Sequence, residues 1–233
     1  MHAKIKTVVT GTAALLLACG LAGKALAAEP QVELKTTAGD IVLELNGDKA
    51  PKSTANFLAY VKSGFYKDLI FHRVIDGFMI QAGGYTKDLK GRATRPNVPS
   101  ESKNGLSNAP YTVAMARLDN PNSANSQFFI NVGNNVALDY PNFDGVGYTV
   151  FGRVISGYEV VDKISKVLVD DKSFTFQNVP VIPVVIKSAN VLKKPIQPKP
   201  VPGQAAESAG MSANSAASTP AEAPLEPTPA PAQ

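Results

Sequence analysis

The chain has 233 residues, of which 18% are charged, a formal net charge of +4 at neutral pH and one cysteine. Its first 27 residues contain three lysines and no acidic residue, so the rest of the chain carries a net charge of only +1. A nearly neutral chain without a Lys/Arg-rich run among aromatic residues has no general electrostatic reason to bind nucleic acid, and we expect no nucleic-acid partner.

Residues 1–27 have the pattern of a secretory signal peptide. Lys4 and Lys6 precede an apolar stretch over residues 8–22, and an A-x-A cleavage site follows at residues 25–27. The stretch is shorter than the ~20 residues that a membrane-spanning helix needs, and no second such stretch follows, so we expect no membrane span. The pattern predicts export, with the periplasm as the destination.

A second interpretation of the leader depends on Cys19. The sequence LLAC at residues 16–19 resembles a lipoprotein signal, in which the cysteine is acylated and becomes the first residue. Cleavage after Ala27 instead removes the cysteine, and the mature chain then has no thiol for a disulfide, a catalytic thiolate or a metal site. The sequence leaves open whether the mature protein is free in the periplasm or is a membrane-anchored lipoprotein that faces the periplasm.

Residues 195–233 differ in composition from the rest of the chain. They consist mainly of Pro, Ala, Ser, Glu and Gln and contain no aromatic residue. Such a segment buries too little apolar surface to offset the entropy of ordering it, so it is predicted to be disordered. It is either a spacer or a weak ligand of the protein's own substrate groove. Residues 28–194 are expected to form a single domain.

The domain begins with the pattern of a β-hairpin. Residues 32–37 and 41–45 alternate apolar and polar side chains on either side of the turn residues 38–40. A helix is predicted next, because Pro51 is typical of a helix start, apolar residues follow at helical spacing, and Gly64 is typical of a helix end.

The remaining elements are short strands separated by clusters of Gly, Asn, Pro and Asp. They are predicted at residues 70–74, 78–81, 112–116, 128–132, 149–155 and 184–192, with a second short helix at 158–166. Many short strands and only two helices favour a mainly β protein with a closed or nearly closed barrel. The Gly/Asn/Pro-rich stretches 83–110 and 117–126 are expected on its surface.

Several common catalytic sites are excluded. The sequence has no phosphate-binding glycine loop, no H-E-x-x-H zinc motif and no G-x-S-x-G nucleophile elbow. His72 is the one histidine left once the leader is removed, so we expect no multi-histidine metal site. We interpret His72 as a structural, hydrogen-bonded residue that faces away from its neighbour Arg73, because side chains alternate along a strand.

Two segments combine rigid apolar residues with amide and guanidinium donors. One is FHRVIDGFMIQAGG (71–84), which contains Arg73 and Gln81, and the other is SANSQFFINV (123–132), which contains Gln127. An arginine within an apolar run is unusual unless it is paired or part of a working surface. Together the two segments predict an apolar depression bordered by donors, suited to a small apolar ring that carries an amide.

Five blocks of sequence resemble the cyclophilins, a family of peptidyl-prolyl cis-trans isomerases, and they occur in the family's order. They are APKSTANF (50–57), GFYKDLIFHRVIDGFMIQAGG (64–84), VAMAR (113–117), SQFFINV (126–132) and YTVFGRVISGYEVVDKI (148–164). The resemblance implies an eight-stranded antiparallel barrel capped by two helices and an enzyme without a cofactor. Its substrates would be proline-containing polypeptides. With the leader, it implies an exported bacterial isomerase that assists protein folding, and we expect a monomer.

The resemblance also assigns roles to individual residues. Arg73 would donate to the proline nitrogen in the transition state, and Gln81 would orient Arg73. The other implied site residues form the proline pocket (Phe78, Met79, Phe129, Leu138), the groove for the peptide backbone (Ala116, Arg117, Gln127) and the pocket edge (Tyr148). Five positions depart from the family. Ala137 stands where animal cyclophilins usually have the tryptophan that binds cyclosporin, and Tyr148 replaces a usual histidine. Arg117 replaces a common asparagine, Ala82 a usual glycine and Asp76 a common proline.

Two other functions remain open from the sequence. The groove of a cyclophilin-like domain can serve as a chaperone or docking site without isomerisation, and a barrel can present the Pro/Ala-rich tail as a surface structural protein. An isomerase assay distinguishes a chaperone or docking site, which binds without accelerating isomerisation, from an enzyme. The retained site residues argue against the second. The client proteins, the pathway and the oligomeric state are not determined by the sequence.

Overall fold

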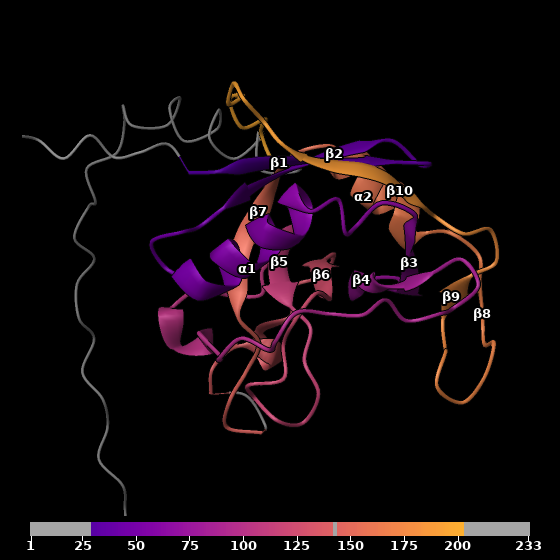
Figure 1. Cartoon of the computed structure of the whole chain (residues 1–233), viewed down its shortest axis with the longest axis horizontal. Helices are drawn as coiled ribbons and strands as arrows, with labels where there is room; N and C mark the ends of the chain where they lie inside the picture. Colours follow the sequence, from indigo (N-terminus) through magenta and orange to yellow (C-terminus); the bar gives the residue numbers. More distant parts are fainter. Residues whose placement is uncertain (1–28, 142–143, 203–233) are drawn as a thin grey trace, which may run out of the picture.

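Eight antiparallel strands form one sheet that curls into a nearly closed barrel (Figure 1). The computed structural model describes residues 29–141 and 144–202, so the leader with Cys19 and residues 203–233 of the tail lie outside the described residues. The strands follow the order β10-β1-β2-β7-β5-β6-β4-β3 in the sheet. Their bounds are β1 Gln31–Thr36, β2 Asp40–Leu45, β3 Leu69–Ile75, β4 Met79–Thr86, β5 Thr112–Met115, β6 Phe128–Asn131, β7 Val150–Ser156 and β10 Ile186–Val191.

The two edge strands of the sheet, β10 and β3, approach each other and complete the barrel. Ile70 and Val185 form a bridge, and the amides of Asp68 and Phe71 donate to the carbonyls of Ile186 and Val184 at 2.8 and 2.9 Å. Pairing the edges removes most of the unsatisfied backbone groups that an open sheet would expose. The predicted mainly β fold, an eight-stranded antiparallel barrel with two helices, is confirmed.

Two α-helices pack on the barrel, α1 (Pro51–Lys62) and α2 (Tyr158–Ser165). The predicted start of the first helix at Pro51 is confirmed, but its cap comes from elsewhere in the chain. The carboxylate of Glu101 accepts hydrogen bonds from the backbone amides of Lys52 and Ser53 at 2.9 and 2.8 Å. Because the first amides of a helix have no partner within it, this carboxylate both satisfies them and attaches a long loop to the barrel.

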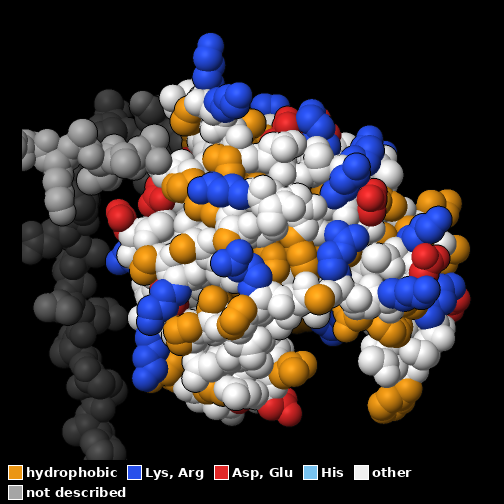
Figure 2. Space-filling view, in the orientation of Figure 1, with side chains coloured by type: hydrophobic (Ala, Val, Ile, Leu, Met, Phe, Trp, Pro, Cys, Tyr) orange, Lys and Arg blue, Asp and Glu red, His pale blue; other side chains and the backbone are white. Residues whose placement is uncertain are grey.

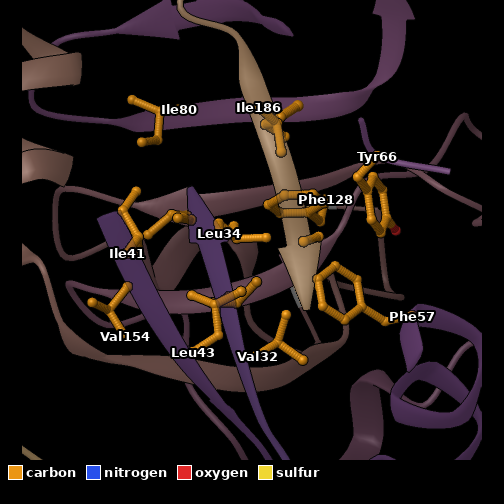
Figure 3. Close-up of a cluster of buried hydrophobic side chains, with 14 of the residues drawn as sticks. Val32, Leu34, Ile41, Leu43, Phe57, Tyr66, Ile80, Phe128, Val154 and Ile186 are labelled. Carbon is orange, nitrogen blue, oxygen red and sulfur yellow. The ribbon is translucent and has the colours of Figure 1, made fainter. Parts of the chain in front are cut away.

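The barrel interior is filled by large apolar side chains from the strands and α1 (Figure 3). Phe57 of α1 reaches the edge of the Phe128 ring with ring centres 5.3 Å apart, and Tyr66 meets Phe128 in the same manner at 5.5 Å. The Tyr66 hydroxyl donates to the carbonyl of Ser126 at 2.9 Å, which satisfies the one polar atom of a fully buried ring. This packing fixes the position of β6, the strand that carries Phe129.

Strand β4 continues to Thr86, beyond the predicted end at residue 81. Gly83 and Gly84 indicate a loop in the sequence, but both lie in the strand, and a Cβ atom on Gly83 would come within 2.5 Å of the Ser126 carbonyl oxygen. The glycines therefore permit a close approach between neighbouring chain segments rather than a turn.

Some short elements are not apparent from the sequence. They are the two-stranded hairpin of β8 (Val169–Asp170) and β9 (Val179–Pro180), which projects to one side of the barrel in Figure 1, and the 3₁₀ helices η1 (Ser102–Asn104) and η2 (Val136–Leu138). Two-residue strands are too short to show an alternating pattern, so periodicity cannot detect them.

Residues 195–202 belong to the segment that the composition predicts to be disordered, yet they are hydrogen-bonded to the barrel. The side chain of Gln31 exchanges two hydrogen bonds with the backbone of Ile196, at 2.7 and 3.0 Å, and the amide of Lys199 donates to the Ile155 carbonyl at 2.8 Å. Val201 packs against the core. These hydrogen bonds and the Val201 contact attach the stretch to the barrel, which its composition alone does not indicate.

Candidate active site

Nine of the ten predicted site residues border one cavity of about 130 Å³, which we call the catalytic cavity. They are Arg73, Phe78, Met79, Gln81, Ala116, Arg117, Phe129, Leu138 and Tyr148. The tenth, Gln127, borders an adjacent cavity of about 240 Å³ that shares Gln81, Ala116 and Arg117 with the first. The sequence therefore identified residues that lie together although they are as far apart in the chain as Arg73 and Tyr148.

Strand register explains how these side chains meet. Strand β4 lies between β3 and β6, and its Gln81 is the partner of Arg73 on one side and of Phe129 on the other. Phe129 is in turn paired with Ala114 of β5. Directly opposed residues project to the same face of a sheet, so one row across four strands carries the donor, the amide and the aromatic floor.

The floor of the catalytic cavity is an apolar cluster separate from the barrel core. Its buried residues are Met79, Ala114, Phe129 and Val150, of which Met79 and Phe129 border the cavity. Met79 is 1% exposed and Phe129 is 4% exposed, so both are held by packing. The ring of Tyr148 stands against Phe129, with ring centres 5.7 Å apart and an angle of 76° between the ring planes. A small apolar ring in this cavity would be dry and closely confined.

Arg73 is a cation at the edge of this cavity. Its guanidinium makes no hydrogen bond or ion pair with any other described residue, and partial burial lowers its pKa from the ordinary value. A guanidinium carries five N–H donors, and partly buried donors left unpaired are unfavourable. The arrangement therefore leaves these donors free for a ligand in the cavity.

Gln81 does not hydrogen-bond to Arg73 in the described part of the chain, although the two residues are direct neighbours across β3 and β4. Its Nε2 donates instead to Oε1 of Gln127 at 2.9 Å. This bond fixes the Gln127 side chain beside the catalytic cavity. The structure thus links Gln81 to the groove residue Gln127 more directly than to the arginine.

The Arg117 side chain has a supporting position that the sequence did not indicate. It is 5% exposed, donates to the carbonyls of Gly147 and Leu118, each at 3.0 Å, and forms an ion pair with Asp144. This bond to Arg117 is the main reason that the pKa of Asp144 is lowered to about 2. The guanidinium also lies 4.4 Å from the centre of the Tyr148 ring. Arg117 therefore holds Tyr148 in place as the wall of the cavity.

A network of polar side chains supports the segment that carries Leu138. Nδ2 of Asn135 donates to the carbonyl of Phe78 at 2.8 Å and to Oδ1 of Asn131 at 2.7 Å. The carboxylate of Asp139 accepts hydrogen bonds from Asn108 at 2.6 and 2.8 Å. Several asparagines near one another were visible in the sequence only as turn residues, because their pairing depends on the fold.

His72 is buried as expected, with 6% of its surface exposed, but it does not face away from Arg73. Its Nδ1 atom has no hydrogen-bond partner among the described residues. A register shift between Phe71 and Arg73 interrupts the alternation of β3, and His72 borders a cavity together with Arg73. Burial lowers the pKa of His72 to about 4, so the imidazole is neutral near pH 7.

The described residues contain no group of three or more His, Cys, Asp or Glu side chains that could hold a metal ion. They also contain no helix that is long and apolar enough to cross a membrane.

Comparisons with known proteins show the family of this chain. Residues 31–191 match the family model of cyclophilin type peptidyl-prolyl cis-trans isomerases. The chain is 52% identical over 163 residues to peptidyl-prolyl cis-trans isomerase A of Dickeya dadantii, covering 70% of this chain and 85% of that protein. It is 46% identical over 162 residues to peptidyl-prolyl cis-trans isomerase B of Escherichia coli, covering 69% of this chain and 98% of that protein.

Solved structures show the same relationship. The crystal structure of a cyclophilin type peptidyl-prolyl cis-trans isomerase from Cryptosporidium parvum superposes with a TM-score of 0.59 at 29% sequence identity, covering 72% of this chain and 99% of that one. A second structure of the same protein, in the presence of the dipeptide Ala-Pro, gives a TM-score of 0.58 at 29% identity, with 70% of this chain and 99% of that one covered. The chain thus belongs to the cyclophilin type peptidyl-prolyl cis-trans isomerases, and it is an enzyme of that class.

Proposed function

We propose that this isomerase works in the periplasm, where it assists the folding of exported proteins by accelerating rotation about their X-Pro bonds. The observation that carries the proposal is the Arg73 guanidinium, which has no partner among the described residues, at the edge of a cavity of about 130 Å³. The leader supports the location, because its basic residues, apolar stretch and A-x-A site have the order of a secretory signal. The clients would be proline-containing segments of newly exported chains.

Rotation about an X-Pro bond is slow because it interrupts amide resonance. The barrier is about 18–20 kcal/mol, so the uncatalysed step takes ~10–100 s. In the twisted state the proline nitrogen regains its lone pair and accepts a hydrogen bond, which it cannot do in either planar state. A donor aimed at that nitrogen binds the transition state better than the ground states, and this difference lowers the barrier. Arg73 is the donor in this proposal.

Arg73 accounts for only part of the rate enhancement. One hydrogen bond from a charged donor contributes about 1.5–3 kcal/mol, whereas an acceleration of five orders of magnitude requires roughly 7 kcal/mol. The rest comes from confinement. Phe129 and Met79 hold the proline ring in a dry site while the preceding carbonyl rotates, and the amide of Gln127, fixed by Gln81, positions the peptide backbone.

The proposal can be tested on the full chain expressed with its leader in a bacterial host. We expect the exported protein to have the mass of the chain from residue 28 onward. It should also accelerate cis-trans exchange of an Ala-Pro peptide, measured by NMR. A mass that corresponds to an acylated chain from Cys19 onward would support the lipoprotein form. Retention in the cytoplasm would contradict the location. Peptide binding without faster exchange would contradict the enzymatic role and favour a docking module.

Cyclosporin is expected to inhibit this protein at least tenfold more weakly than a cyclophilin with tryptophan at the equivalent of Ala137. Ala137 lies exposed in η2, next to Leu138 of the catalytic cavity, where a tryptophan would add a large contact surface for the drug. Loss of such a contact is on the order of 2 kcal/mol at a binding hot spot. The measurement is the inhibition constant of the wild type and of Ala137→Trp, which should bind more tightly. Equal, tight inhibition of both would show that Ala137 does not occupy that position.

A further inference from the structure

A further cavity, of about 190 Å³, adjoins the catalytic cavity, and its lining residues other than Arg73, Gln81 and Gln127 have no role in the mechanism above. We call it the second cavity. The two cavities share Arg73 and Gln81. The second one extends from these residues to Leu118 on one side and to Phe176, in the loop between β8 and β9, on the other. Figure 2 shows a hollow between the lobe at the lower right, which the β8–β9 hairpin forms, and the loops below the barrel. A substrate bound at Arg73 therefore has this cavity immediately beside it.

One side of the second cavity is an aromatic wall, made of His72, Tyr85 and Phe176. The rings of Tyr85 and Phe176 meet edge to face with their centres 4.9 Å apart, and Tyr85 and His72 do so at 4.8 Å. On the opposite side, the Leu118 side chain is 77% exposed. Aromatic faces and edges bind other rings and large apolar side chains favourably.

Local hydrogen bonds stabilise the loop that presents Phe176. The Lys172 amide donates to the Phe176 carbonyl at 2.8 Å, and the Phe176 amide donates to Oγ of Ser173 at 3.1 Å. The loop is also attached to the strand that carries Arg73, because the Val74 amide of β3 donates to the Asn178 carbonyl at 2.9 Å. Phe176 is thus prepositioned relative to Arg73, which reduces the entropy lost when a ligand binds.

The charge of the residues that line the second cavity determines which substrate side chains bind there favourably. Among the described residues that border it, Arg73 is the only one charged near neutral pH, since burial keeps His72 neutral and none of the others is a carboxylate. A guanidinium attracts the face of an aromatic ring and repels a lysine or arginine. An aromatic side chain therefore meets favourable groups on two sides, and a basic one meets a like charge without a counter-ion.

We infer that the second cavity is a substrate subsite for an aromatic or large aliphatic side chain close to the proline, so that the enzyme prefers prolines with such a neighbour and disfavours those with a basic neighbour at the same position. The inference rests on the isomerase function proposed above. It narrows the substrate class to apolar, proline-containing segments, which in a folded protein would be buried and are accessible while the chain is unfolded.

The test uses peptides built on one Ala-Pro reference, with Phe, Ala or Lys placed singly at each of three positions on either side of the X-Pro bond. The value of kcat/KM is obtained from NMR exchange rates for the full chain. At one position we expect the Phe peptide to be at least fivefold better than the Ala peptide, and the Lys peptide to be worse than both. Acceleration of the reference with no such difference at any position would overturn the subsite. No acceleration of the reference would contradict the isomerase function itself.

Two variants of the same loop complete the test. In Phe176→Ala the ratio of the Phe to the Ala peptide should fall to near one. The matched control is Phe174→Ala, because Phe174 is 96% exposed and does not border the cavity, and it should keep the wild-type ratio. Addition of the Phe peptide should also shift the amide resonances of Tyr85 and Gln177 in the wild type. A wild-type ratio in Phe176→Ala would contradict the assignment of this cavity.

Discussion

Replacement of Arg73 by alanine is expected to lower kcat/KM for an Ala-Pro peptide at least tenfold. The guanidinium borders the catalytic cavity and has no partner among the described residues, so its loss removes a donor without breaking an ion pair. A hydrogen bond to a charged donor contributes about 1.5–3 kcal/mol, and each 1.36 kcal/mol is a factor of ten in rate. The exchange rate of the peptide, measured by NMR with wild type and variant at equal concentration, gives the comparison.

Two control variants separate this effect from a general effect of charge or folding. Arg153 lies on β7 and forms an ion pair with Glu44. The variant Arg153→Ala therefore removes another arginine of the barrel and should leave kcat/KM unchanged. Arg73→Lys keeps the charge but not the planar set of donors, so its kcat/KM should lie between the values of Arg73→Ala and the wild type. The urea midpoint of Arg73→Ala should stay near that of the wild type. Near-normal activity in Arg73→Ala would exclude the proposed mechanism.

The parts of the fold that follow from local sequence were predictable. The β1–β2 hairpin lies within one residue of its predicted bounds because apolar and polar residues alternate along β1 and turn residues separate it from the apolar β2. Helix α1 begins at Pro51, as the missing proline N–H leads one to expect. Short-range patterns of this kind do not depend on which strands become neighbours.

The features that could not be predicted depend on contacts between distant segments. The Glu101 cap of α1 joins residues 48 positions apart, and the Gln81–Gln127 bond joins residues 46 positions apart. The sequence showed donors at both glutamines, but not that they would bind each other. Gly83 appeared to be a turn residue because its close approach to the Ser126 carbonyl exists only after β4 and β6 have paired.

The residues that line the site were predictable from the sequence, but the contacts that hold their side chains in place were not. The resemblance named the residues that line the catalytic cavity, and those residues do lie together. It gave Arg117 a place in the groove, whereas the structure shows its side chain bonded to Gly147, Leu118 and Asp144 and stacked on Tyr148. The family usually has asparagine at this position, so the contacts of the arginine side chain could not be inferred from the resemblance and are seen only in the structure.

The stability of the protein is expected to fall between pH 6.5 and pH 4 because of His72. Burial lowers the pKa of His72 to about 4 in the folded protein, while in the unfolded chain its pKa is near 6.5. The unfolded state therefore binds a proton first as the pH falls. The contribution of the neutral imidazole to stability is fully present above pH 6.5, decreases through this interval and shows no further loss below about pH 4. At 1.36 kcal/mol per pH unit, the total decrease is roughly 3 kcal/mol.

The measurement is the free energy of unfolding in urea at several pH values from 7 to 4, with His72→Gln as the control. Glutamine is neutral throughout, so the variant should lose most of the slope whatever its stability at pH 7. Asp144 does not contribute to the change in this pH range. The hydrogen bond from Arg117 lowers the pKa of Asp144 to about 2, so the stability that Asp144 contributes is lost only at lower pH. Parallel curves for wild type and variant would show that His72 is not the titrating group. A decrease confined to the wild type would locate the acid sensitivity of the barrel at the single histidine beside Arg73.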